Sequence, residues 1–129
     1  MDKPQVFISY SQADSVWARS FAEALKNHGF RVWFDQFDIG AGESLRDALE
    51  TGLRDSDVFV TLVERENLQS PNLFFELGAA IGMKKRVVAI VPKDIDPAKL
   101  PVELRLRRYL VRDSPQGTAE ELSESLTAA

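Results

Sequence analysis

Short apolar runs alternate along the chain with stretches of helical periodicity. Runs rich in β-branched and aromatic side chains predict five strands, at residues 6–10, 31–34, 57–63, 87–91 and 109–111. Apolar positions three and four residues apart predict helices over residues 16–27, 44–53 and 70–84, and again from Thr118 onward. Gly29 is expected to close the first helix in a left-handed conformation, and Pro71 to open the third.

The order of these elements predicts the fold class. Strands made of continuous apolar runs are buried on both faces, which is typical of a parallel sheet covered by helices. Right-handed crossovers leave few topologies, and five strands favour the flavodoxin-like order 2-1-3-4-5. We therefore expect a three-layer α/β sandwich in which residues 1–129 form a single domain.

Composition and charge narrow the choice of function. The 129 residues are 44% apolar and 28% charged, as in an ordinary globular domain, and carry a net charge of −4. This mild negative charge disfavours nucleic acid as a partner. No apolar run approaches the roughly 20 residues that a membrane span needs, and residues 1–4 do not begin a signal peptide. We expect a cytoplasmic protein with no membrane partner.

The supply of reactive side chains excludes several chemistries. The chain has no cysteine, so disulfides, thiolate catalysis and Cys-based zinc sites are ruled out. Its one histidine, His28, leaves little for a Ser-His-Asp triad and is interpreted as a helix-end residue. We expect neither a metal site nor a resident cofactor.

Topology predicts where a ligand would bind. In sheets of this order, ligands bind beyond the carboxyl ends of the strands, where the strand order reverses. That point lies between the first and third strands, so residues 9–14 and 64–76 should border the site.

Glu76 is the candidate acid in this region. The residues three, four and seven positions from it along the predicted helix include no cation. A carboxylate in such surroundings must reach water or find hydrogen-bond donors. Glu76 is therefore a candidate functional acid; the alternative is a glutamate on the surface or at the rim of the core that backbone amides satisfy.

Three motifs, in this order along the chain, carry a family resemblance. They are VFISYS at residues 6–11 with Asp14, GFRVWFD at residues 29–35, and SPNLFFELGAA at residues 70–80. Together they resemble the bacterial type of the Toll/interleukin-1 receptor (TIR) domain, over about residues 5–127. The resemblance implies a flavodoxin-like domain that either assembles signalling complexes or cleaves NAD⁺.

The resemblance also assigns roles to residues. In the enzymatic members the glutamate of the third helix is catalytic, and Glu76 occupies that position. Residues expected to bind the substrate are Ser9, Tyr10, Ser11, Asp14, Trp33, Asp35, Ser70 and Asn72. Asn72 stands where the family often has an aromatic residue, commonly Trp, four residues before the glutamate. An assembly loop is expected at Phe37, Asp38, Ile39 and Gly40.

Several of these residues also have an ordinary structural role open to them. Asp14 and Ser15 could cap a helix, Trp33 could be a core residue, and Ser9 and Tyr10 could simply end a strand.

The chemistry of NAD⁺ cleavage suits a site with one acid. Nicotinamide leaves as a neutral molecule, so no general acid is needed. The transition state resembles an oxocarbenium ion, as in glycoside hydrolysis, and one carboxylate can stabilise it or hold the ribose hydroxyls. We predict an NAD⁺ hydrolase that releases nicotinamide and ADP-ribose or a cyclic ADP-ribose, with NAD⁺ as substrate. Self-association in immune or stress signalling would activate it, and a fused or separate sensor domain would be a partner.

Two alternatives stay open. In the first, the chain is a non-enzymatic interaction module. The acidic loop with Phe37 and Ile39 at its tip then docks onto a second copy, which gives head-to-tail assembly. The basic surface that could receive this loop is offered by residues 84–86 and by Arg105, Arg107, Arg108 and Arg112. In the second, the chain is a nucleoside deoxyribosyltransferase-like enzyme, with which residues 72–78 are also compatible.

Overall fold

A computed structural model describes residues 4–10, 12–33, 52–64, 71–100, 102–105 and 109–127, with the backbone alone at 12, 71–76, 103 and 105. The elements are β1 (Gln5–Ser9), η1 (Gln12–Asp14), α1 (Ser15–Asn27), β2 (Arg31–Trp33), β3 (Val58–Leu62), α3 (Pro71–Gly82), β4 (Arg86–Val91), η3 (Pro97–Lys99), α4 (Val102–Arg105), β5 (Tyr109–Val111) and α5 (Pro115–Thr127). Residues 52–54 are also helical, and the rest of the helix predicted over 44–53 lies outside the described residues.

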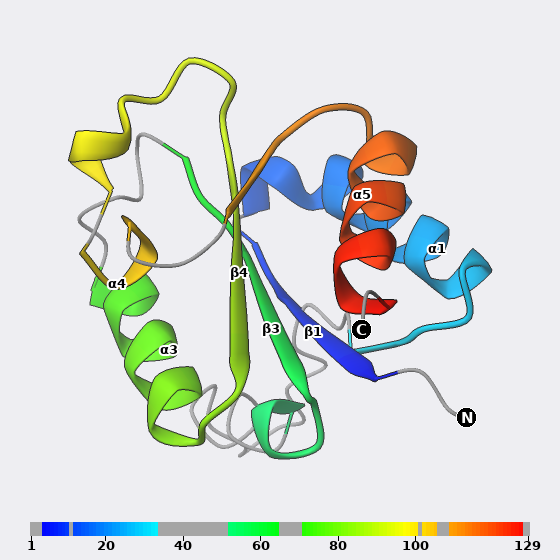
Figure 1. Ribbon diagram of the computed structural model, residues 1–129, viewed down its shortest axis with the longest axis horizontal. Coiled ribbons are helices and arrows are strands. Elements are labelled where there is room, and N and C mark those ends of the chain that lie inside the picture. Colours follow the sequence, from blue (N-terminus) through cyan, green and yellow to red (C-terminus); the bar gives the residue numbers. More distant parts are fainter. Residues whose placement is uncertain are drawn as a thin grey trace.

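The five strands form one parallel sheet in the order β2-β1-β3-β4-β5 (Figure 1). The predicted fold class and strand order are therefore confirmed. Every residue of the central strand β3 is buried, because helices cover both of its faces.

Helices cover the two faces of the sheet in two groups, with α1 and α5 on one side and α3 and α4 on the other (Figure 1). Alternate residues of β1 and β3 serve the two cores, as the period of a strand requires. Val6, Ile8 and Val60 join the core beneath α1 and α5. Phe7 and Phe59 join the core on the α3 side.

Helices α1 and α3 end in the same hydrogen-bond pattern. After α1, Gly29 has a φ of 92°, which confirms the prediction of a left-handed glycine there. After α3, Lys84 takes the equivalent place with a φ of 60°. In both, the next amide reaches back to a carbonyl five residues earlier, from Phe30 to Leu25 and from Lys85 to Ala80.

The predicted start of the last helix was wrong. The helix α5 begins at Pro115 rather than Thr118, and the Ser114 hydroxyl caps it by accepting the Gly117 amide at 3.0 Å. Thr118 is buried, and its hydroxyl accepts the amide of Asp113 at 3.0 Å. The Ser-Pro pair that opens this helix is the same signal that predicted the start of α3 at Pro71.

Candidate functional site

The strand order reverses between β1 and β3, so their carboxyl ends flank the predicted binding position. Ser9, the last residue of β1, is paired with Thr61 of β3. Tyr10 and Glu64 follow the two strands directly. Because α3 connects the parallel strands β3 and β4, it begins at this same carboxyl end of the sheet (Figure 1).

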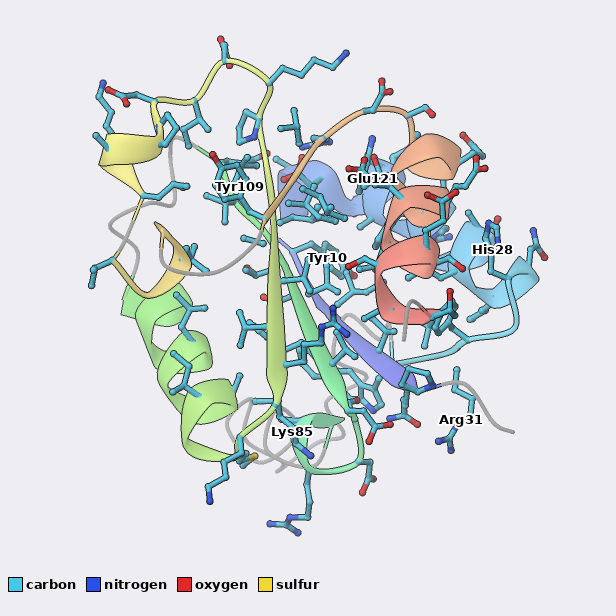
Figure 2. All side chains as sticks on the ribbon, in the orientation of Figure 1. Tyr10, His28, Arg31, Lys85, Tyr109 and Glu121 are labelled. Carbon is cyan, nitrogen blue, oxygen red and sulfur yellow. The ribbon has the colours of Figure 1, made fainter. Side chains whose placement is uncertain are left out.

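Ser9 and Tyr10 begin the turn that leads from β1 to α1. Both side chains are half-buried. Tyr10 packs against the core that α1 and α5 share with the sheet (Figure 2). The beginning of the turn is therefore held by β1 and packs on the side of the sheet that α1 and α5 cover.

Asp14 closes this turn in an ion pair. Its side chain is nearly buried, and its Oδ1 atom accepts a hydrogen bond of 2.9 Å from Nη1 of Arg112. Among the described residues, Asp14 makes no side-chain hydrogen bond that caps α1, so the alternative role of helix cap is not the one observed. Arg112 follows β5 directly and is largely covered, so it does not belong to a free basic surface.

Trp33 lies on the other face of the sheet. Its ring stacks on Phe7, with centroids 4.8 Å apart and planes 8° from parallel. A Cβ atom added to Gly52 would lie 2.7 Å from the Phe7 ring and 2.8 Å from the Trp33 ring. Trp33 is half-buried, and these contacts place it in the packing on the α3 side.

Glu76 and Asn72 both lie in the N-terminal half of α3. Position 76 precedes buried Ala80 by one helical turn, so it belongs to the stripe of α3 that faces the sheet. Gly78, two positions further on, is exposed. The backbone thus brings position 76 to the sheet side of α3, near the end of the sheet where the strand order reverses.

Several predicted residues fall outside the described part of the chain. They are Ser11, Asp35 and Ser70 of the predicted substrate site and Phe37, Asp38, Ile39 and Gly40 of the predicted assembly loop. The side chains of Glu76 and Asn72 are likewise outside it. Within the described ranges, no group of three or more His, Cys, Asp or Glu residues could hold a metal ion. No helix in those ranges is long and apolar enough to cross a membrane.

Sequence reasoning missed the partner of Asp14. The sequence alone suggests that Arg112 belongs to a basic surface with the neighbouring arginines. However, a basic residue directly after one strand and an acidic residue in the turn after another reach the same end of a parallel sheet. The guanidinium carbon of Arg112 also lies 4.6 Å from the centre of the Trp17 ring. The signal that could have found this ion pair is the presence of opposite charges just after two strands of one parallel sheet.

A family model described as "TIR domain" matches residues 6–126. The chain is 28% identical over 125 residues to the NAD(+) hydrolase TcpA of a Theionarchaea archaeon, which covers 96% of this chain and 34% of that protein. It is 32% identical over 76 residues to the 2' cyclic ADP-D-ribose synthase BtTIR of Bacteroides thetaiotaomicron, covering 58% of this chain and 26% of that protein. The chain thus spans about a quarter to a third of the length of these relatives.

Among solved structures, the fold is similar to that of a metazoan TIR-STING receptor from C. gigas. The TM-score is 0.78 at 21% sequence identity, over 95% of this chain and 39% of the receptor chain. This likeness agrees with the fold derived above from the strand order.

Proposed function

The chain belongs to the TIR domain family, and from this premise we propose that it cleaves the bond between nicotinamide and ribose in NAD⁺. The relative named NAD(+) hydrolase supports this proposal most directly, because its similarity runs over 96% of the chain. The relative named 2' cyclic ADP-D-ribose synthase points to the same bond. The products are nicotinamide together with ADP-ribose or a cyclic ADP-ribose.

Glu76 is the catalytic residue in this proposal. It is the one charged residue in the sequence of α3, PNLFFELGAAIG. Position 76 lies on the same stripe of α3 as buried Ala80. It is one helical turn nearer to the start of α3, which is at the carboxyl end of the sheet. A carboxylate at this position can stabilise the positive charge that develops on the ribose, or hold its hydroxyls, as neutral nicotinamide departs.

The turn after β1 borders the proposed substrate site at the carboxyl end of the sheet. Ser9 and Tyr10 begin it and Asp14 ends it, and the carboxyl end of β3 lies alongside. NAD⁺ is the substrate, bound with contributions from the remaining predicted residues: Ser11, Trp33, Asp35, Ser70 and Asn72. Copies of the chain self-associate through the loop that carries Phe37, Asp38, Ile39 and Gly40.

Incubating the purified protein with NAD⁺ and separating the products by chromatography tests the activity. Nicotinamide should appear together with ADP-ribose or its cyclic form. Glu76→Gln should lower the rate by roughly a hundredfold or more, as removal of a group that stabilises transition-state charge does. The matched control is Glu23→Gln, the same change at an exposed position of α1, which should keep the parent rate.

Two results would overturn the proposal. One is a Glu76→Gln protein that releases nicotinamide as fast as the parent. The other is cleavage of nucleosides or nucleotides, offered in parallel, by a parent protein that leaves NAD⁺ intact.

The same assay, repeated over a range of protein concentrations, tests self-association. A rate per molecule that rises with concentration supports it, and a constant rate contradicts it.

A further inference from the structure

The segment that follows β5 is tied to the beginning of α1 by three side-chain contacts. Arg112 donates to the Asp14 carboxylate at 2.9 Å. Its guanidinium lies over the Trp17 ring, 4.6 Å from the ring centre. The indole N–H of Trp17 donates in turn to the carbonyl oxygen of Asp113 at 3.0 Å. Two segments nearly 100 residues apart in the chain are therefore joined at the carboxyl end of the sheet.

Burial separates this tie from an ordinary surface ion pair. The side chains of Asp14 and Arg112 are 6% and 25% exposed. Lys93 and Asp113 form an ion pair at the same end of the sheet, but at 3.5 Å and with side chains about 70% exposed. Breaking a covered pair leaves a charge without its partner and is strongly unfavourable, whereas an exposed pair contributes little. The Asp14 carboxylate is thus held firmly where Arg112 places it.

The other end of the tie is anchored as well. The amide of Arg112 donates to the carbonyl oxygen of Val91 in β4 at 2.7 Å. The amide of Asp113 donates to the hydroxyl of buried Thr118 in α5 at 3.0 Å. The guanidinium therefore extends from a backbone that both the sheet and α5 hold in place.

We propose that Arg112 is a positioning residue that acts through Asp14. It fixes the end of the turn after β1, whose beginning β1 already holds at Ser9, and so keeps the turn ordered beside the substrate. The part of this inference that concerns NAD⁺ rests on the proposed function. The part that concerns the turn rests on the contacts alone. A turn released at Asp14 would bind the substrate more weakly, because ordering it would then oppose binding.

The experiment compares Arg112→Gln and Arg112→Lys with the control Lys93→Gln. Arg112→Gln removes the charge that pairs with Asp14. Arg112→Lys keeps that charge but loses the planar group over Trp17, and it provides the test if Arg112→Gln does not fold. Lys93→Gln breaks the exposed ion pair nearby and should behave as the parent.

The first measurement is amide hydrogen exchange in the turn. Residues 10–14 should exchange about tenfold faster in Arg112→Gln, less so in Arg112→Lys, and at the parent rate in Lys93→Gln. This readout does not need enzymatic activity. An unchanged exchange rate in both Arg112 variants would overturn the inference.

The second measurement is kinetic. For the Arg112 variants, KM for NAD⁺ should rise about tenfold while kcat stays within about twofold of the parent, since binding rather than chemistry is weakened. A loss of kcat with unchanged KM would overturn the substrate part of the inference. If the parent protein does not cleave NAD⁺, the proposed function fails, and the exchange measurement still decides whether Arg112 positions the turn.

Discussion

Helices α1 and α5 cover one face of the sheet and α3 covers the other, and α1 and α3 differ in how many charged residues they carry. Helix α1 carries Arg19, Glu23 and Lys26, and its N-terminal end is held by the ion pair between Asp14 and Arg112. Helix α3 has twelve residues, of which Glu76 alone is charged. On the α1 side, charge is solvated or used to hold elements together. The lone acid of α3 has no cation three, four or seven positions away in the sequence, which is why Glu76 is a candidate functional acid.

The cores beneath the two faces also differ. On the α3 side, three rings lie in register across neighbouring strands: Phe7 stacks on Trp33 at 4.8 Å and on Phe59 at 5.7 Å. On the α1 side, within the described part of the chain, Phe21 is stacked on Trp17 at 5.2 Å. These three stacked rings form part of the core on the α3 side. The α1 side depends more on aliphatic packing and on polar ties at its edge.

Phe7→Ala sharpens this comparison with the largest expected effect. Removing a fully buried Phe costs about 3–5 kcal/mol of unfolding free energy. Because Phe7 stacks on both Trp33 and Phe59, whereas among the described residues Phe21 stacks on Trp17, Phe7→Ala should cost about 1 kcal/mol more than Phe21→Ala. Urea denaturation of both variants measures the difference. A smaller loss for Phe7→Ala than for Phe21→Ala would show that the row of rings adds nothing to ordinary burial.

Gly52→Ala tests how closely the chain approaches that row. The added methyl group would lie 2.7 Å from Phe7 and 2.8 Å from Trp33, so the rings must shift. Overpacking of this kind costs about 1–3 kcal/mol.

Gly78→Ala is the matched control on the same side of the sheet. A Cβ there meets no atom within 4 Å, and the site is an exposed position of α3. Gly78→Ala should raise the free energy of unfolding by about 0.5–1 kcal/mol, because alanine has the higher helix propensity. Equal effects of the two substitutions in thermal denaturation would contradict the close approach at Gly52.

More of the fold than of the candidate site could be predicted from the sequence. The apolar run at residues 58–62 requires cover on both faces, which leads to a parallel sheet, and short crossovers then leave few strand orders. The beginning of α5 was missed because Thr118 fits a capping pattern, while its hydroxyl serves Asp113 in the folded protein. The capping pattern at Thr118 cannot separate these two uses of a threonine, whereas the Ser-Pro pair at residues 114–115 marks the observed start of the helix.

For the site, topology alone predicts the end of the sheet at which a ligand would bind, and the spacing of charges along α3 singles out Glu76 as the candidate acid. The contact between Asp14 and Arg112 could not be derived in the same way. These residues follow strands that are not neighbours in the sheet, and they meet through the packing of α1 against α5. A tie of this kind depends on tertiary geometry, which hydrophobic periodicity does not encode.

The ends of α1 and α3 offer the smallest and most direct comparison. The two ends share one hydrogen-bond pattern, with Gly29 in the left-handed position of the first and Lys84 in that of the second. A side chain with a Cβ is disfavoured there by roughly 1 kcal/mol. Lys84→Gly should therefore stabilise the protein by up to about 1 kcal/mol, and Gly29→Ala should destabilise it by a similar amount. Opposite shifts of the urea midpoint are expected, and a loss of stability in Lys84→Gly would mean that the lysine side chain contributes more than its backbone conformation costs.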